Sequence, residues 1–378
     1  MGRIEDLKKI LEETVACGAS DVHFEPGEPP SLRFRGSLVP MKAYAPWMEE
    51  DMTETFQEIE GLSMERFSRE PQIDFSFSLE LSPSPGGERK KVRWRGHTGL
   101  SLGQRTVHLR LLQEHPPLPQ ELGLPPKLVE RVKNSFGGLY LITGITGSGK
   151  STTMAALVRY LAETRSLHIV SAEEPVEFLH PRRYEKTGTL VTQVQIPTDC
   201  PTFAEAMRGF LRKDPDVIVV GELRDADTVS MALQAAATGH TVIGTLHTRD
   251  TVSAIERVIS LFPPKESIAI RSQFANALQA IFAQNLIARG EESKTEEEIY
   301  RKGRILAGEL LFSNSIIAQN LFQDKVQNVR NILVENPDMF TMDQNLGMLV
   351  RSGCISLEEG LLHCQNRETF QSIVRSFN

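Results

Sequence analysis

The chain has 378 residues, 40% of them apolar and 24% charged, and its formal net charge is −7. This length favours roughly two or three domains, and the acidic balance argues against a general nucleic-acid-binding protein, which needs a basic surface. No apolar run reaches the roughly 18 residues of a membrane span, and the charged, amphipathic start predicts no signal peptide. The four cysteines form no Cys-x-x-Cys pair, so we expect a reduced cytoplasmic chain without disulfides or structural zinc.

The first part of the chain predicts a small α+β domain. Apolar residues recur at helical spacing from Ile4 to Cys17, which predicts a helix there. Alternating apolar and polar residues then predict strands in three segments, 31–39, 73–81 and 107–112. The segment 83–87, Pro-Ser-Pro-Gly-Gly, is typical of a loop or hairpin tip. This domain, residues 1–113, carries no catalytic motif of its own.

A proline-rich segment follows this domain. Residues 114–126 contain five prolines. Because proline fits neither the interior of a helix nor a central strand, we expect an extended hinge here. The hinge separates the domain at 1–113 from a second domain at 127–378.

In the second domain, short apolar runs alternate with helical patterns. The runs that predict buried strands lie at 139–143, 168–172, 217–220 and 241–245. Strands that alternate with helices indicate an α/β fold with a mostly parallel sheet covered on both faces. From Ser267 onward the pattern predicts helices, interrupted by a hairpin over 299–311, and the acidic stretch 291–298 is typical of a solvated loop.

Residues 144–151 read Gly-Ile-Thr-Gly-Ser-Gly-Lys-Ser, which satisfies a phosphate-binding pattern. They lie between a predicted strand and a predicted helix, where backbone N–H groups form a nest for a triphosphate. Lys150 would reach the β- and γ-phosphates, and the Ser151 hydroxyl would ligate Mg²⁺. The predicted nucleotide contacts are Gly144, Thr146, Gly147, Ser148, Gly149, Lys150, Ser151 and Thr152. The pattern predicts binding of ATP or GTP, against the alternative of a Gly-rich turn that binds nothing.

Three later segments can supply the acids and cations that phosphoryl transfer needs beyond a phosphate loop. The first ends a strand in Glu173, Glu174 and a proline, at the strand end where ligands sit in such sheets. The second, 216–222, is a Walker B shape with Glu222 at its tip, suited to Mg²⁺ or its water shell. The third, 238–248, places a histidine on either side of one apolar strand. Each segment alone also fits a solvated strand end, but together after a phosphate loop they favour a nucleotide hydrolase.

Further motifs extend over nearly the whole chain, at 19–23, 214–225, 342–346 and 356–361. The first reads Ala-Ser-Asp-Val-His, and the second contains Asp-Pro-Asp and then Gly-Glu-Leu-Arg-Asp. Together with the phosphate loop, the acidic box (173–175), the Walker B segment (216–222) and the two-histidine box (238–248), they resemble the secretion-superfamily ATPases of type II secretion and type IV pili. Within that superfamily the chain most resembles the PilT-like pilus retraction ATPases.

The resemblance implies an N-terminal PAS-like domain and a C-terminal RecA-like ATPase domain, assembled as a homo-hexamer that binds ATP and Mg²⁺. It implies that Glu173 is the catalytic glutamate that polarises the attacking water. Glu222 would be the Walker B glutamate near Mg²⁺, which Ser151 also ligates. His240 and His247 correspond to histidines thought to couple nucleotide state to movement between subunits.

The resemblance also implies an arginine that acts between subunits. Arg110 matches an arginine of the N-terminal domain that reaches a neighbour's nucleotide, and Arg95 and Arg105 are companion candidates on a looser match. An arginine delivered across an interface stabilises the charge that develops on the phosphoryl group. Activity would therefore require a ring.

The sequence departs from the family pattern at several positions. Ile145 replaces the usual proline of the phosphate loop, and Glu174 replaces an aspartate of the acidic box. The segment 193–196 lacks an arginine and a glutamate that the family carries there. In the C-terminal motif associated with retraction, Gln319 and Gln323 stand where the family has arginines. The core ATPase residues thus persist while coupling elements differ.

The resemblance predicts a hexameric motor for pilus retraction and twitching motility at the inner face of the bacterial inner membrane. Its partners would be copies of itself and an inner-membrane pilus platform protein, with no nucleic acid and no membrane contact except through partners. Three alternatives stay open: a pilus assembly or type II secretion ATPase, a nucleic-acid translocase on the same core, and an accessory ring member. The first usually carries an extra N-terminal domain and a four-cysteine zinc insert, and the second a basic surface. The third is favoured only by Gln319 and Gln323.

Overall fold

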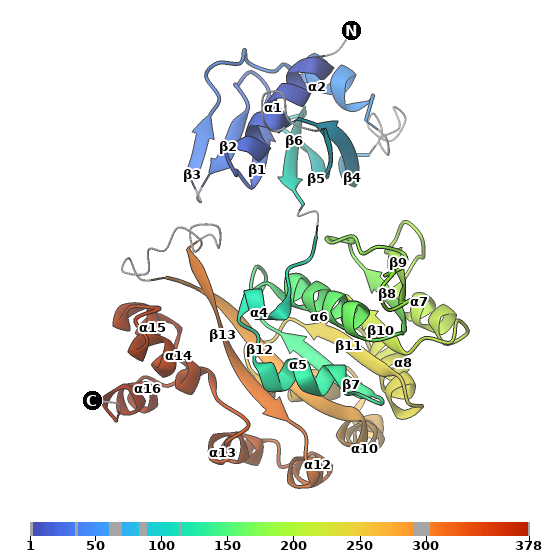
Figure 1. Ribbon diagram of the computed structural model, residues 1–378, viewed down its shortest axis with the longest axis vertical. Coiled ribbons are helices and arrows are strands. Elements are labelled where there is room, and N and C mark those ends of the chain that lie inside the picture. Colours follow the sequence, from blue (N-terminus) through green and yellow to red (C-terminus); the bar gives the residue numbers. More distant parts are fainter. Residues whose placement is uncertain are drawn as a thin grey trace. The chain divides into compact units, whose positions relative to one another are not determined.

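The computed structural model describes residues 3–34, 37–59, 70–82, 89–112, 115–289 and 303–376. The chain divides into two compact units, Met1–His115 and Pro116–Asn378. Each unit encloses its own hydrophobic core, and Figure 1 labels the helices and strands of both. Among the described helices, none combines the length and the apolar composition that spanning a bilayer requires.

In its described residues, the first unit is an antiparallel sheet with two helices packed against it. Its strands are β1 (Asp21–Phe24), β2 (Ser31–Phe34), β3 (Ser37–Pro40), β4 (Gln72–Leu81), β5 (Lys90–Ser101) and β6 (Gln104–Leu111). They lie in the order β3-β2-β1-β6-β5-β4, and all neighbouring pairs are antiparallel. The helices α1 (Ile4–Ala16) and α2 (Glu49–Phe56) contact this sheet. The predicted α+β class of this domain is confirmed.

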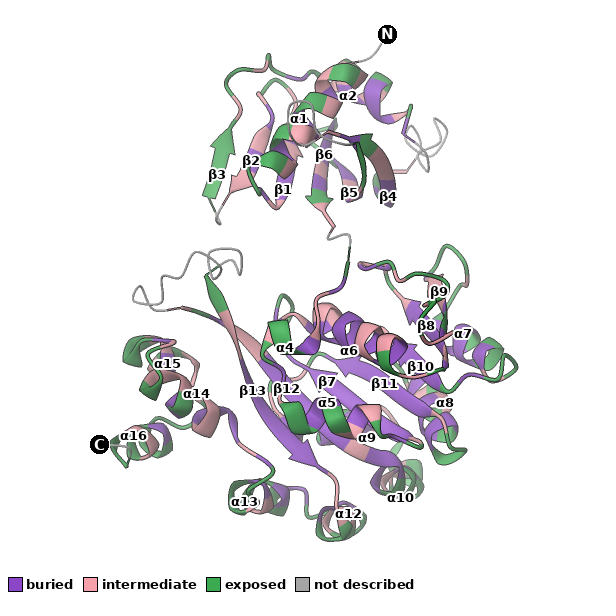
Figure 2. Ribbon diagram, in the orientation of Figure 1, coloured by how far each residue is buried: buried purple, intermediate pink, exposed green. Residues whose placement is uncertain are grey.

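Alternation along the strands gives this sheet one apolar and one polar face. In β1, Val22 and Phe24 are fully buried in the core, whereas Asp21 and His23 lie on the opposite face because successive side chains alternate. The apolar face packs with Trp47 and with the buried residues of α1 and α2. Figure 2 marks the buried positions of these strands and helices in purple. The polar face is thereby left to carry charged side chains.

Some elements of the first unit differ from the sequence-based expectation. The segment 31–39 contains two strands, β2 and β3, instead of one. The sequence pattern does not predict β1, which has too few residues to establish an alternation, or β5, which begins with two exposed lysines. The predicted loop at 83–87 lies outside the described residues.

The second unit is centred on a seven-stranded sheet in the order β13-β12-β7-β11-β10-β8-β9. Its strands are β7 (Gly138–Thr143), β8 (His168–Glu173), β9 (Leu190–Gln195), β10 (Val217–Val220), β11 (Thr241–Leu246), β12 (Leu278–Ala288) and β13 (Arg304–Phe312). Neighbouring strands are parallel except for β12 and β13. Every residue of β7, β10 and β11 is buried, as strands covered on both faces require. The predicted mostly parallel sheet is confirmed.

Helices cover both faces of this sheet (Figure 1). They are α4 (Pro119–Leu122), α5 (Pro126–Lys133), α6 (Lys150–Thr164), α7 (Phe203–Phe210), α8 (Ala226–Ala237), α9 (Thr251–Ser260), the 3₁₀ helix η1 (Pro264–Glu266), α10 (Ser267–Ala277), α12 (Ser315–Phe322), α13 (Gln327–Glu335), α14 (Met342–Arg351), α15 (Leu357–His363) and α16 (Arg367–Arg375). Because β7, β11, β10 and β8 are parallel neighbours, the loops after their carboxyl ends lie at one edge of the sheet.

The prediction of continuous helix from Ser267 to the hairpin is wrong. The segment Leu278–Ala288 is the strand β12, which lies between β7 and β13. Most of its residues are buried on both faces, so no period of two appears in the sequence, and its alanines imitate a helical pattern. The hairpin therefore pairs β12 with β13, and the acidic stretch 291–298 lies outside the described residues.

The proline-rich segment also differs from the expected extended hinge. Its described part contains the short helix α4, and α5 begins at Pro126. Proline is compatible with the first turn of a helix because the N–H group that it lacks has no intrahelical partner there. Leu124 between the two helices is buried in the core of the second unit. Much of the segment is therefore part of that unit.

Candidate active site

The phosphate loop joins β7 to α6, and two of its glycines are required by the backbone. Gly149 has a φ of +88° and precedes the first residue of α6. Gly144 has a φ of +153°, and a Cβ at this position would lie 2.4 Å from the carbonyl oxygen of Gln284 on β12. Larger residues would be strained at either position. The loop is thus shaped by its own backbone and by the neighbouring strand.

The Lys150 side chain folds back over this loop. Its Nζ donates hydrogen bonds to the carbonyl oxygens of Gly144 (2.8 Å) and Ile145 (3.1 Å). Burial lowers the pKa of Lys150, while the carboxylates of Glu222 and Glu177 oppose that shift. The carboxylate of Glu222, just after β10, therefore favours the charged form of Lys150.

Glu173 is the last residue of β8, and its carboxylate is held by two side chains. The Ser171 hydroxyl donates to Oε1 at 2.7 Å, and the Gln193 amide nitrogen donates to the same oxygen at 3.2 Å. The Gln193 nitrogen also donates to the carbonyl oxygen of Phe178 at 2.8 Å. These contacts fix the orientation of the carboxylate at the sheet edge that carries the phosphate loop.

Two departures from the family pattern have defined contacts beside Glu173. Glu174, which replaces an aspartate, places Oε2 2.6 Å from Nη1 of Arg224. Gln195, in the segment that lacks the family's arginine and glutamate, accepts a hydrogen bond from the backbone N–H of Val176 at 3.4 Å and donates one to Thr198 at 3.3 Å. An amide therefore binds the backbone where the family has an ionised side chain.

Glu222 is the centre of an ion-pair cluster. Arg224 Nε lies 2.7 Å from Glu222 Oε2, and His247 Nε2 lies 3.4 Å from the same oxygen. Burial alone would lower the pKa of Arg224, but Glu222 and Glu174 outweigh it and raise the pKa. Arg224 is a site residue to which the sequence alone assigns no role, although it lies in the Gly-Glu-Leu-Arg-Asp motif. The Glu-x-Arg spacing at 222–224 is the signal that points to it.

The two histidines of the third motif lie at opposite ends of β11. His247 follows the strand and reaches Glu222, as described above. His240 precedes the strand, where its carbonyl oxygen accepts from the N–H of Gly138 at the start of β7. Its ring Nδ1 lies 3.1 Å from both the Ala235 carbonyl oxygen and the Thr238 hydroxyl. Within one subunit, the structure brings His247 but not His240 to the acidic cluster.

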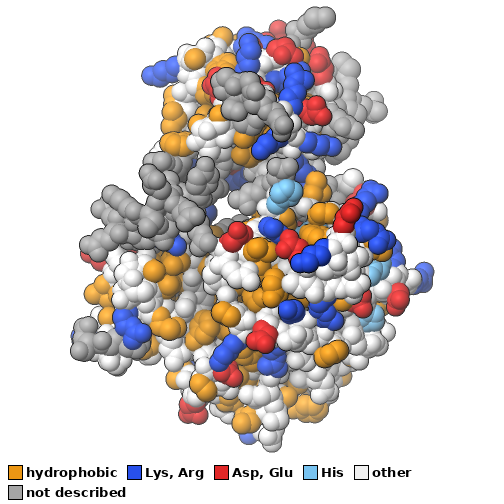
Figure 3. Space-filling view, viewed as in Figure 1, with side chains coloured by type: hydrophobic (Ala, Val, Ile, Leu, Met, Phe, Trp, Pro, Cys, Tyr) orange, Lys and Arg blue, Asp and Glu red, His pale blue; other side chains and the backbone are white. Residues whose placement is uncertain are grey.

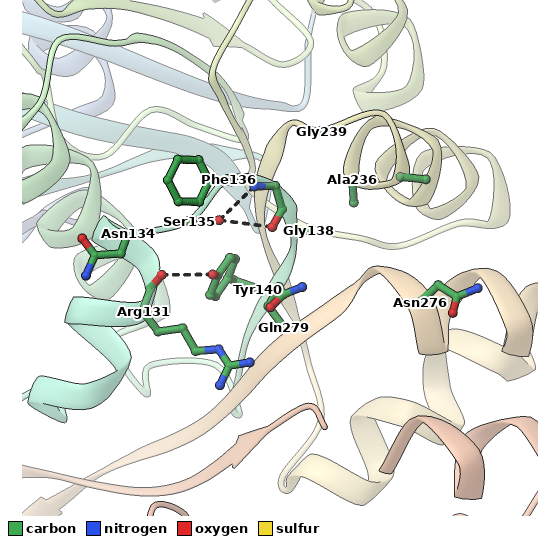
Figure 4. A pocket seen from close by; sticks show the side chains of 12 residues that line it. Arg131, Asn134, Ser135, Phe136, Gly138, Tyr140, Ala236, Gly239, Asn276 and Gln279 are labelled. Atoms are coloured by element: carbon green, nitrogen blue, oxygen red, sulfur yellow. Dashed lines mark hydrogen bonds between the residues drawn. The ribbon is translucent and has the colours of Figure 1, made fainter. Parts of the chain in front are cut away.

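A cavity of about 620 Å³ lies at the His240 end of the sheet, away from the phosphate loop. Figure 4 shows Gly138 and Gly239 on its wall, with Phe136 and Gln279 beside them. The Phe136 side chain is 93% exposed. This cavity contains none of the predicted nucleotide contacts, so its volume does not mark it as the candidate active site.

Two hydrogen bonds connect the strand before the phosphate loop to the histidine motif. Thr143, the last residue of β7, donates its hydroxyl to the carbonyl oxygen of Thr248 at 2.7 Å. The N–H of Thr248 donates back to the Thr143 hydroxyl at 3.1 Å. The residue before the phosphate loop is therefore joined to the residue after His247, a connection that the sequence pattern does not reveal.

The predicted Mg²⁺ ligands are chemically suited to that ion. Ser151 supplies a hydroxyl oxygen at the start of α6, and Glu222 supplies a carboxylate oxygen near the same loop. Mg²⁺ prefers oxygen ligands and keeps several waters, using one or two carboxylates with the phosphates of a nucleotide. The donor set at this sheet edge fits that preference.

The three candidate arginines of the first unit, Arg95, Arg105 and Arg110, lie on strands of its antiparallel sheet. Arg110 on β6 is 63% exposed, and its Nε lies 2.7 Å from Oδ1 of Asp21 on β1. Burial alone would raise the pKa of Asp21, but hydrogen bonds from Ser20 and Arg110 outweigh it and lower that pKa. Arg95 lies directly opposite Arg110 on the same sheet face. Arg105 is buried, and its Nη2 donates to the carbonyl oxygen of Glu70 at 2.7 Å, so it is committed to its own unit.

Comparison with known proteins identifies the family. The chain matches the Type II/IV secretion system protein family, T2SSE, over residues 3–314. The chain is a member of that family. The matched residues include nearly all of the first unit, the phosphate loop and the acidic cluster. The resemblance inferred from the motifs is confirmed.

Relatives within the type II/IV secretion system family cover almost the whole chain. It is 34% identical over 370 residues to the type IV pilus retraction ATPase PilT of Pseudomonas aeruginosa, covering 97% of this chain and 100% of that protein. It is 28% identical over 373 residues to the type IV pilus ATPase PilU of the same species, covering 98% and 91%. The crystal structure of the pilus retraction motor PilT with bound ADP aligns with a TM-score of 0.84 at 33% identity, covering 97% and 98%.

Proposed function

We propose that this chain is a Mg²⁺-dependent ATPase that assembles as a homo-hexamer and powers retraction of type IV pili. The proposal is carried by one observation: the phosphate loop, Glu173 and the cluster of Glu222, Arg224 and His247 lie at the carboxyl ends of parallel strands, at one sheet edge. A nucleotide phosphate, a water-orienting carboxylate and a metal-binding carboxylate are needed together for phosphoryl transfer. The full-length similarity to a pilus retraction ATPase supports retraction as the work performed.

In this proposal each site residue has a separate role. Lys150 and the loop N–H groups bind the triphosphate, and Ser151 and Glu222 would hold a Mg²⁺ ion, which would supply positive charge to the phosphate oxygens. Glu173, fixed by Ser171 and Gln193, orients the attacking water and receives its proton. Arg224 neutralises the charge of Glu174 and Glu222. His247, which contacts Glu222, links this cluster to the segment that follows β11.

We also propose that the ring completes the active site. Arg110, with Arg95 as its companion, would act on the nucleotide of a neighbouring subunit, and His240 would serve a contact between subunits. The ring would act at the inner face of the bacterial inner membrane through a pilus platform protein. The face of the second unit seen in Figure 3 mixes basic and acidic side chains, which does not favour a nucleic-acid translocase.

Deleting the gene for this chain should leave cells with excess surface pili and no twitching motility. A retraction motor removes pili, so its loss lets them accumulate. Pilus number by electron microscopy and twitching on agar measure this, with the Lys150→Ala chain expressed in the deleted strain as the control for motor activity. Cells without pili would contradict retraction and favour an assembly or secretion motor.

An accessory retraction motor is the second candidate, because Gln319 and Gln323 lie exposed on and just after α12. Arginine makes charged, bidentate contacts that glutamine cannot reproduce. If α12 binds the membrane partner, Gln319→Arg with Gln323→Arg should speed retraction, measured by pilus tension, while the ATPase rate in solution stays unchanged. Arg at the exposed position Glu335, on the next helix, is the control for added charge. If all variants retract pili at the same speed, Gln319 and Gln323 give no support to the accessory retraction motor.

A further inference from the structure

Gln284 is a buried polar residue that contacts the phosphate loop from β12. Its Nε2 donates to the carbonyl oxygen of Ser148 at 2.6 Å, and its Oε1 accepts from the Thr153 hydroxyl of α6 at 2.8 Å. Gln284 is 2% exposed, and Ser148 and Thr153 are each 1% exposed. Water cannot reach these groups to replace either hydrogen bond. The amide therefore joins the phosphate loop, the helix that follows it and the neighbouring strand.

The loop approaches Gln284 closely at two glycines. A Cβ on Gly144 would lie 2.4 Å from the Gln284 carbonyl oxygen, and a Cβ on Gly149 would lie 3.3 Å from its Nε2. Real Cβ atoms essentially never come as close as the first of these distances, so the glycines let the loop lie directly on β12. Both the backbone and the side chain of Gln284 thus support the loop that carries Lys150.

We propose that Gln284 is a positioning residue that holds the phosphate loop in the conformation that binds ATP. The inference rests on the proposed nucleotide-binding function. It adds a residue that lies outside the phosphate loop and outside the three segments that carry Glu173, Glu222 and the two histidines. An amide can donate to a carbonyl and accept from a hydroxyl at once, whereas an ionised carboxylate only accepts and leucine does neither. Without the donor, the buried Ser148 carbonyl oxygen is unpaired or the loop moves off β12.

Gln284→Leu should weaken ATP binding roughly tenfold, the usual effect of leaving one buried polar group unpaired. KM for ATP should rise while kcat changes less than KM, because Glu173 and Glu222 come from other strands. Gln279→Leu is the matched control: it makes the same change at the far end of β12, on the wall of the cavity in Figure 4. Thermal unfolding and hexamer content check that each variant folds and assembles.

Gln284→Glu separates the hydrogen bond from simple packing. Burial raises the pKa of a carboxyl, so the protonated side chain at low pH can donate to Ser148, whereas the carboxylate at high pH repels that carbonyl oxygen. ATP affinity divided by the wild-type value at the same pH should rise as the pH falls from about 8 to about 5.5. The elements beside Gln284 carry other charged or titratable groups, namely Lys150, Arg159 and Glu163 on α6, Arg304 and Glu309 on β13, and His363 on α15. The wild-type chain carries the same groups, so dividing by its affinity removes the effects that do not depend on residue 284.

Three results would overturn the assignment. Folded Gln284→Leu protein with a wild-type KM would show that the loop does not need this residue. If the KM of Gln284→Glu is raised but its ATP affinity relative to wild type does not change with pH, then Gln284 acts only through packing. A wild-type chain that binds no ATP would overturn the proposed function itself, and the role of Gln284 with it. A raised KM together with rescue at low pH supports the proposal.

Discussion

Glu173→Gln should stop ATP turnover while ATP stays bound. Glutamine fills the same space, and its carbonyl oxygen can still accept from Ser171 and Gln193, so the loop geometry is preserved. Its amide cannot take a proton from water, and general-base catalysis typically contributes about 10²–10⁴ in rate. We expect a loss of that size in kcat with little change in ATP affinity. Phosphate release at saturating ATP and equilibrium binding of a fluorescent ATP analogue measure the two quantities.

Glu222→Gln is the comparison that tests the division of roles. Glu222 is a proposed Mg²⁺ ligand and also contacts Arg224 and His247. Its neutralisation should therefore weaken Mg²⁺-dependent ATP binding as well as turnover. The effect should shrink as the Mg²⁺ concentration is raised, whereas the Glu173→Gln defect should not. Near wild-type turnover by Glu173→Gln, with tight binding and no turnover by Glu222→Gln, would mean that the two roles are reversed.

Several helices and strands could be predicted because their signals are local. β10 was expected at 217–220 and is found at Val217–Val220, since a strand buried on both faces reads as an uninterrupted apolar run between polar ends. The phosphate loop is specified by the residues that form it. The helix α1 shows the same rule, because its buried residues recur at helical spacing within one segment.

The parts that the sequence could not predict depend on contacts between distant segments. β12 is an interior strand because β7 and β13 pair with its two edges, so its mostly buried residues show no strand period. Gln284 contacts the phosphate loop from 136 positions along the chain, and no spacing rule connects them. Arg224 lies within a recognised motif, but its bond to Glu174 appears only when β8 and β10 are neighbours.

The separation of the two histidines, by contrast, follows from strand geometry. Six residues of β11 lie between His240 and His247, and a strand rises about 3.3 Å per residue. The two rings are therefore at opposite edges of the sheet, and only His247 can contact the acidic cluster of its own subunit. A shared role for both residues would require contacts with another subunit at the His240 end.

Arg110→Ala should abolish most ATPase activity of the ring without reducing ATP binding by a subunit. A trans-acting arginine is worth about 10³–10⁵ in rate in small GTPases, and we expect a smaller loss here. Arg110 is largely exposed in its ion pair with Asp21, but the Asp21 side chain is only 9% exposed, so thermal unfolding and hexamer content are measured beside the activity. Arg33→Ala is the matched control, because Arg33 on β2 lies directly opposite Asp21 in the strand register and therefore on the same sheet face.

Mixing Arg110→Ala with Lys150→Ala subunits distinguishes action across an interface from action within one chain. Each variant alone lacks one half of every site: the first lacks the arginine, and the second lacks the ammonium that counters the triphosphate charge. In a mixed ring, a subunit with Lys150 can face a neighbour with Arg110, and that composite site is intact. Activity should therefore reappear at an intermediate mixing ratio, measured as phosphate release from rings shown by mass spectrometry to contain both chains. Mixed rings that stay inactive would show that Arg110 acts within its own subunit, and the proposed dependence of catalysis on ring assembly would lose its chemical basis.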